Sequence, residues 1–261
     1  MRRSKVLEKL RAGKPVLMTM TSLAPAPLAV EIAGRAGMDA VWLDMEHRPF
    51  TPREVAELIA AARLGDVDAV VRVRKGEGYT CFFRPLEDGA AGIIVPHVTT
   101  TTEAEWVVRN AKYPPLGRRG IEIVMPDADL SFSDPHAYMA HANRETFVVI
   151  QIEDVEALAQ LDAIIAVPGV DIIFIGPADL TASMGIPFAF DHPYYAEAIT
   201  RISNAAAKCG KWWGLPVKDA AEAAAYAARG ARFFNIGSDL RLLKDSFLAI
   251  RAAFNRALGL E

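Results

Sequence analysis

Short apolar segments alternate with longer, Ala-rich segments along the chain. The apolar segments are rich in Val, Ile and Phe, which is typical of strands, whereas the Ala-rich segments have helical spacing. The predicted strands lie at 15–23, 40–46, 69–74, 92–98, 146–153, 170–176, 212–217 and 231–237. A predicted helical segment follows each one, which makes eight β-then-α units. Because the apolar runs are nearly continuous, they indicate parallel strands covered on both faces.

Two folds share this alternation, a (β/α)₈ TIM barrel and a doubly wound open sheet. We predict the barrel, because the chain has eight units and no G-x-G-x-x-G turn after its first strand. The 261 residues suit a single barrel domain, 1–261, since Pro and Gly are not concentrated in any linker. The long irregular segment 114–144 is predicted to be a functional loop or an interface arm.

Composition narrows the possible partners. Net charge is −3, with 52% hydrophobic and 23% charged residues and no Lys/Arg run, so we expect no nucleic-acid partner. No apolar stretch approaches the roughly 20 residues of a membrane span, and the basic N-terminal segment lacks the features of a signal peptide. Cys81 and Cys209 have neither metal-ligand nor disulfide spacing, which fits a reducing cytoplasm. We therefore expect a cytoplasmic protein without a membrane partner.

Two acidic residues stand where predicted buried strands end. Glu153 closes the run VVIQIE, and Asp179 follows the run DIIFIGPA. In a β/α barrel both would lie at the C-terminal rim, where active sites collect. Two hard oxygen ligands at that rim suit a divalent cation, although each acid could instead simply cap the next helix. Gln151 precedes Glu153 by two residues, so both side chains should point the same way.

Polar residues at strands two and three add catalytic candidates. His47 follows Asp44 by three residues, so the carboxylate could hold the imidazole and raise its basicity. Arg72 lies inside a Val-rich strand, where an unpaired guanidinium would be costly. Its partner is either Asp44 or Glu46, or a carboxylate or enolate oxygen of a ligand. The sequence leaves these alternatives open.

The segment GPADLTASMG contains a further candidate. Gly176 and Pro177 should turn the chain, and the amides around Ala178 and Asp179 could open toward an anion at a helix start. His97, at the end of strand four, also faces the rim by position, without an assignable role.

Five blocks together resemble one family, from about Val16 to the C-terminal helix. They are WLDMEH, GIIVPHV, YPPLGRRG, VVIQIED and FIGPADLTASMG. The chain thus resembles the HpcH/HpaI class II pyruvate aldolases, which include 4-hydroxy-2-oxoheptanedioate and 2-keto-3-deoxy-sugar-acid aldolases. QIE and GPADL, which place Asp179 26 residues after Glu153, form a specific pair.

The resemblance implies a (β/α)₈ barrel and assigns roles to residues at its rim. Glu153 and Asp179 would bind a divalent cation (Mg²⁺, Mn²⁺ or Co²⁺), His47 would be the base, and Arg72 would stabilise an enolate. Asp44 is the remaining catalytic candidate within the subunit, beside His47 and Arg72. The implied substrate contacts are Gln151, Gly176, Pro177, Ala178, Asp179 and Leu215. IEIVMPDADLSF departs most from the family pattern, which leaves the acceptor aldehyde open.

An acid from a neighbouring subunit is also implied. The family pattern L-D-x-G-A reads LEDGA here, so Glu87, with Asp88 as the alternative, would act on His47 of another subunit. The family exchanges its last helix between partners and assembles as a trimer of dimers, which implies a homohexamer. The helix 240–258 has apolar residues on more than one face, which independently suggests an oligomer. It could otherwise be an amphipathic barrel helix on its own subunit.

The expected reaction is reversible cleavage of a 4-hydroxy-2-oxo acid to pyruvate and an aldehyde through a metal-bound pyruvate enolate. No Schiff-base lysine is needed, which agrees with strands that no lysine interrupts. One alternative is a related lyase or decarboxylase acting on oxaloacetate-like acids. A second alternative is a catalytically silent metabolite-binding protein, against which the complete set of acid, base and metal ligands argues.

Overall fold

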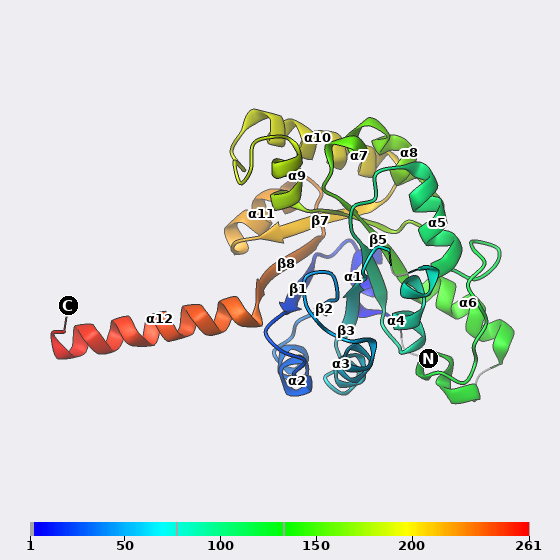
Figure 1. Ribbon diagram of the computed structural model, residues 1–261, viewed down its shortest axis with the longest axis horizontal. Helices are drawn as coiled ribbons and strands as arrows, with labels where there is room; N and C mark the ends of the chain where they lie inside the picture. Colours follow the sequence, from blue (N-terminus) through cyan, green and yellow to red (C-terminus); the bar gives the residue numbers. More distant parts are fainter. Residues whose placement is uncertain (1–2, 77, 133, 261) are drawn as a thin grey trace.

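Eight parallel strands close into a barrel in chain order (Figure 1). The computed structural model describes residues 3–76, 78–132 and 134–260. Its strands are β1 (Val16–Thr21), β2 (Ala40–Asp44), β3 (Asp68–Arg72), β4 (Gly92–Val95), β5 (Phe147–Ile152), β6 (Ile172–Ile175), β7 (Trp212–Val217) and β8 (Phe233–Ser238). All eight lie within the predicted segments or one residue beyond them. The (β/α)₈ prediction is confirmed.

Helices surround the barrel and close its N-terminal mouth. They are α1 (Lys5–Arg11), α2 (Pro27–Arg35), α3 (Pro52–Leu64), α4 (Arg84–Glu87), α5 (Thr101–Ala111), α6 (Pro135–Glu145), α7 (Val155–Ala159), α8 (Leu161–Ala166), α9 (Pro177–Ser183), α10 (Pro193–Lys208), α11 (Ala220–Ala228) and α12 (Asp239–Leu258), with 3₁₀ turns η1 (Tyr79–Phe82) and η2 (Pro126–Ser131). None of the helices in the described ranges combines the length and the apolar character that a membrane span needs.

Local sequence fixes where a typical helix of this barrel begins. Thr51 precedes α3, and its side chain accepts a hydrogen bond from the Glu54 N–H while the Glu54 carboxylate accepts one from the Thr51 N–H. This capping box satisfies two N–H groups that the first helical turn leaves without partners. Pro52 occupies the first turn, where its missing N–H costs nothing. The loop after β2 therefore ends at a defined point.

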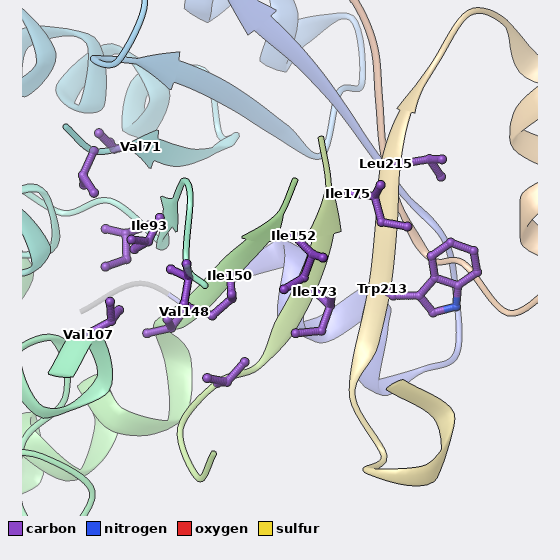
Figure 2. Packing of buried hydrophobic residues seen from close by; sticks show 14 of the residues in the cluster. Val71, Ile93, Val107, Val148, Ile150, Ile152, Ile173, Ile175, Trp213 and Leu215 are labelled. Atoms are coloured by element: carbon purple, nitrogen blue, oxygen red, sulfur yellow. The ribbon is translucent and has the colours of Figure 1, made fainter. Parts of the chain in front are cut away.

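Strand side chains feed two separate cores. Inward-facing residues such as Met18, Val70 and Phe174 fill the barrel. Outward-facing residues such as Val71 and Ile173 share a second cluster with helix residues such as Val107, and Figure 2 shows part of it. Both faces of each strand are thus apolar, which explains the nearly continuous hydrophobic runs.

Parallel pairing brings the carboxyl ends of all strands to one rim. In the β2–β3 pair Asp44 lies opposite Arg72, and in the β5–β6 pair Gln151 lies opposite Phe174. A residue just after any strand therefore lies near the residues that end its neighbours. This register places most of the predicted site residues at the C-terminal rim.

The segment predicted as a loop or arm is partly helical, because it contains η2 and α6. Arg119 anchors it from the inside: its Nη2 lies 3.1 Å from Asp127 Oδ2 and its guanidinium lies over the Tyr113 ring. Tyr138, on α6, hydrogen-bonds to both Tyr113 and Asp127. The buried ion pair and two tyrosines fold this segment against the barrel wall.

Helix α12 projects away from the barrel and ends far from it (Figure 1). None of its 20 residues is buried. Asp239 ties its start to the end of β1, because one carboxylate oxygen accepts hydrogen bonds from the N–H and the hydroxyl of Ser22. The helix is thus anchored at one end, and its apolar side chains Phe247, Ile250 and Phe254 are exposed.

Candidate active site

Arg72 is held by two carboxylates at the end of β3. Its Nε and Nη2 donate to the two oxygens of Asp44 at 2.9 and 2.7 Å. Its Nη1 lies 3.0 Å from Glu46 Oε2, and the guanidinium lies over the Trp42 ring, 4.8 Å from its centroid. The side chain is only 6% exposed. The sequence left open whether Arg72 pairs with Asp44, with Glu46 or with a ligand, and in the structure it contacts both acids. Two of the five N–H donors of its guanidinium remain for a ligand.

Asp44 is an ionised, fully engaged carboxylate. Burial opposes its charge, but hydrogen bonds and charge from Arg72 and N–H donors from Glu46 and His47 lower the pKa of Asp44 below its ordinary value. The N–H of His47 lies 3.4 Å from Asp44 Oδ1. Asp44 therefore contacts the main chain of His47, not its imidazole.

The imidazole of His47 instead approaches Glu46. Its Nε2 lies 3.7 Å from Glu46 Oε2, and the side chain is 57% exposed at the mouth of the barrel. The prediction that Asp44 holds this ring is wrong, because the fork of Arg72 already takes both oxygens of Asp44. Glu46, which the sequence suggested only as a partner of Arg72, is the acid beside the predicted base.

Glu153 is a buried carboxylate surrounded by other negative charges. It is 1% exposed; its Oε1 accepts from the His97 N–H at 2.8 Å, and its Oε2 accepts from the Gln151 amide. Burial raises the pKa of Glu153, the His97 contacts oppose that rise, and the nearby charges of Asp179 and Glu46 add to it. A carboxylate in this position is stabilised when a cation approaches it.

Gly176 allows Glu153 and Gln151 to lie against the end of β6. A Cβ on Gly176 would be 2.2 Å from Glu153 Oε2 and 2.9 Å from Gln151 Nε2. Gly176 then caps α9, and Pro177 occupies the first turn, with Asp179 exposed in that turn. The predicted Gly-Pro turn thus exists, and it lies directly beside Glu153.

His97 occupies an uncommon backbone conformation between two loops. Its φ is +52°, its Nδ1 lies 3.0 Å from Asp154 Oδ2, and its Nε2 lies 3.6 Å from Glu46 Oε1. Burial opposes its protonation, but the Asp154 hydrogen bond and the charges of Glu153, Asp154 and Glu46 raise the pKa of His97. The imidazole is thus poised to be a cation among acids.

Glu87 lies apart from this cluster. It is 5% exposed on α4, with Oε2 3.4 Å from Arg84 Nη1, and burial raises its pKa. With Asp88 it lines a cavity of about 310 Å³ that Met45 and Arg74, just after β2 and β3, also line. The role predicted for Glu87 across subunits stays a prediction.

Leu215 is the one site candidate that faces away from the rim. It is 1% exposed and packs in the outer core between β7 and the helices (Figure 2). Its neighbours Gly214 and Pro216 lie on the opposite, inward face, because side chains alternate along a strand. The substrate contact predicted at Leu215 could therefore involve only its main chain, and it stays a prediction.

Known proteins are similar to this chain in both fold and sequence. The HpcH/HpaI aldolase/citrate lyase model matches residues 19–246. A hydroxypyruvate/pyruvate aldolase from Roseobacter denitrificans is 33% identical over 249 residues, 95% of this chain and 96% of the relative. A 5-keto-4-deoxy-D-glucarate aldolase from Shigella dysenteriae is 34% identical over 245 residues, 94% of each chain. The crystal structure of an HpcH/HpaI aldolase from Desulfitobacterium hafniense has a TM-score of 0.90 at 32% identity, covering 95% of this chain and 96% of that one.

The chain belongs to the HpcH/HpaI aldolase/citrate lyase family. The resemblance carried by the sequence motifs is confirmed. The protein is accordingly an enzyme, a carbon–carbon lyase of the aldolase type.

The rim of this HpcH/HpaI aldolase suits a cation held by few protein ligands. Within the described ranges, no three His, Cys, Asp or Glu side chains are grouped closely enough to hold a metal by themselves. Glu153 is nevertheless buried beside the charge of Asp179, and Gln151 Oε1 is buried without a hydrogen-bond partner among the described residues. Two carboxylates with open positions for water and substrate oxygens fit Mg²⁺ or Mn²⁺.

Sequence reasoning missed two contacts of the rim. Glu46 joins Arg72 to His47, and His97 joins Glu46 to Glu153. Each residue stands two residues beyond the end of a strand, which was a usable signal. The sequence could not show which side chains these residues contact, because loop residues follow no fixed side-chain periodicity.

Proposed function

We propose that this HpcH/HpaI enzyme is a metal-dependent aldolase that reversibly cleaves a 4-hydroxy-2-oxo acid to pyruvate and an aldehyde. The buried carboxylate of Glu153, with the charge of Asp179 nearby, is the observation that carries the proposal. A bound Mg²⁺, Mn²⁺ or Co²⁺ would supply Lewis-acid polarisation of the keto oxygen. The relatives named as pyruvate, hydroxypyruvate and keto-deoxy-glucarate aldolases support a 2-oxo acid substrate.

Arg72 is pre-positioned to receive negative charge. The Asp44 fork fixes the guanidinium plane, so its remaining N–H groups need not reorganise when the enolate forms. The neighbouring Glu46 holds the third nitrogen of the guanidinium, because its Oε2 lies 3.0 Å from Arg72 Nη1. Arg72 therefore stabilises the enolate oxygen by donating hydrogen bonds.

His47 moves the proton. It is exposed at the mouth, and Glu46 lies 3.7 Å from its Nε2, so a proton taken from the methyl group of pyruvate onto the imidazole would be stabilised by that carboxylate. In the direction of cleavage, the same ring would take the C4 hydroxyl proton as the C3–C4 bond breaks and the aldehyde forms, and would then give that proton to the enolate carbon to form pyruvate. Gln151 would contact the substrate, and the amides of Ala178 and Asp179 would hold its carboxylate.

The protein is also proposed to work as a homo-oligomer, a trimer of dimers that exchanges α12. The support is the absence of any buried residue on α12, together with exposed Leu28 and Ile32 on α2. A partner's α12 covering such surfaces would remove large apolar side chains from water. Glu87 would then act on His47 of the neighbouring subunit. Light scattering should show an oligomer that truncation before Leu240 abolishes; a fully active monomer of 28.4 kDa contradicts this assembly.

The test of the reaction uses metal and substrate together. Chelated protein should neither exchange the methyl protons of pyruvate in D₂O nor cleave hydroxy-oxo acids, and added Mn²⁺ should restore both. Borohydride with pyruvate should give no covalent adduct. Full activity in chelator contradicts the proposal. Oxaloacetate in the same assay tests the decarboxylase alternative, which predicts faster turnover of oxaloacetate than of any hydroxy-oxo acid.

A further inference from the structure

His97 links three segments of the rim that are distant in sequence. Its main-chain N–H donates to Glu153 Oε1 at 2.8 Å. Its ring faces Asp154 Oδ2 at 3.0 Å through Nδ1 and Glu46 Oε1 at 3.6 Å through Nε2. His97, in the loop after β4, thus contacts acids in the loops after β2 and β5.

The backbone of His97 adopts an energetically unfavourable conformation. A φ of +52° is uncommon for residues other than glycine, although His, Asn and Asp adopt positive φ more often than the others do. The carbonyl of His97 is held by the ammonium of Lys75, which also pairs with Glu103 at 2.8 Å. An uncommon conformation kept by contacts on both sides of the peptide is a feature of positioned site residues.

Glu46, on the other side of His97, touches both groups that handle the reaction. Its Oε2 lies 3.0 Å from Arg72 Nη1 and 3.7 Å from His47 Nε2, while its Oε1 faces His97. Glu46 is 16% exposed, so a shift of its carboxylate would move the partners of both Arg72 and His47. The ring of His97 faces the remaining oxygen, with its Nε2 3.6 Å from Glu46 Oε1.

We propose that His97 is a positioning residue that holds Glu46 and Glu153 in one geometry, and so couples the cation site to Arg72 and His47. The inference rests on the proposed function. Without the imidazole, the carboxylates of Glu46, Asp154 and Glu153 would face one another as like charges in a partly buried rim and would move apart. The cation site would lose its fixed ligand, and Arg72 would lose its second anchor.

The decisive variants are His97→Gly and His97→Ala. Glycine accepts the positive φ without strain and keeps the N–H bond to Glu153, but it removes the ring. We expect Mn²⁺, measured by isothermal titration without substrate, to bind about 10- to 100-fold more weakly in both variants, the usual effect of losing a partner of a metal ligand. The thermal midpoint of His97→Gly should equal or exceed that of the wild type. His97→Asn, which tolerates this backbone and can donate to Asp154, should recover part of the affinity.

The control is His136→Ala, an exposed histidine on α6, which should bind Mn²⁺ as the wild type does. If His97 serves only the local backbone, His97→Gly will keep wild-type Mn²⁺ affinity and pyruvate deuterium exchange, and the inference is overturned. A wild-type protein that neither binds Mn²⁺ nor exchanges pyruvate protons overturns the proposed function, and this inference with it. Normal wild-type binding with unchanged His97 variants overturns the inference alone.

Discussion

Both ends of the barrel contain buried acids, but they use them differently. At the N-terminal mouth, Glu145 Oε2 accepts from the Ser4 N–H, and its Oε1 accepts from Arg11 and Arg144. Burial opposes its charge, yet the hydrogen bonds from Arg11 and Ser4 lower the pKa of Glu145. At the C-terminal rim, burial raises the pKa of Glu153 despite contacts from His97.

The difference lies in the partners of each acid. Helix α1 lies at the N-terminal mouth, and its first residues bring donors to the acids there; Asp68, for example, accepts from the Ser4 hydroxyl at 2.7 Å and the Val6 N–H at 3.0 Å. At the rim, the nearby charges of Asp179 and Glu46 add to the rise in the pKa of Glu153. A satisfied acid stabilises the fold, whereas an acid crowded by like charges indicates a place for an external cation.

The substitution with the largest expected effect replaces an acidic residue at the rim. Glu153→Gln should reduce aldol cleavage by about 1,000-fold, because a metal ligand that supports several kcal/mol of charge stabilisation is lost. Its thermal stability should be equal to or greater than that of the wild type, since a buried, destabilised charge disappears. Kinetics with added Mn²⁺ and calorimetry measure the two effects. Loss of stability together with full activity would assign Glu153 to the fold.

Arg72→Lys tests the role of the Arg72 guanidinium at the rim. Lysine keeps the charge but cannot form the two-oxygen fork with Asp44 and still reach an enolate. We expect kcat to fall by about 100-fold, comparable to losing one oxyanion donor. Circular dichroism confirms folding, and pyruvate deuterium exchange reports the step affected. Unchanged turnover in a folded variant would mean that Arg72 only pairs acids.

Gly176→Ala tests whether the position of Glu153 matters as much as its charge. The added methyl group would lie 2.2 Å from Glu153 Oε2, so the carboxylate must move. Displacement of a ligand by about 1 Å can cost up to about 100-fold in rate, and we expect about 10- to 100-fold. Gly120→Ala is the matched control, because a Cβ there meets no atom within 4 Å. Equal kcat/KM for both variants contradicts the tight fit of Gly176.

Glu145→Gln should have the smallest effect and the opposite signature. Activity should be unchanged, while the free energy of unfolding falls by about 1.5 kcal/mol, less than a fully buried charged hydrogen bond because Arg11 and Arg144 are largely exposed. A lowered folded pKa stabilises the native state above the unfolded pKa of Glu, and this contribution disappears as pH falls through the folded value. Urea unfolding of both proteins should therefore differ at pH 7 and converge in acid. A constant difference would assign the effect to packing.

The sequence by itself determined the barrel and the composition of its rim. Eight apolar runs followed by helices allow one closed parallel sheet, and parallel pairing obliges Asp44, Arg72, Gln151 and Glu153 to meet at its carboxyl edge. These conclusions depend on periodicity and chain order, which are local properties. The same periodicity places the Leu215 side chain on the outer face, since it alternates with inward-facing Gly214 and Pro216.

Only the tertiary structure decided which charges pair. Asp44 is three residues from His47, yet its carboxylate binds Arg72 on the next strand, and Glu46 and His97 take up the contacts around the predicted base. The closeness of Gly176 to Glu153, and the outward course of α12, likewise emerge only in three dimensions. Strand order fixes which residues share a rim, but the directions of loop side chains and the competition among several acids for one guanidinium depend on distances that exist only once the barrel has closed.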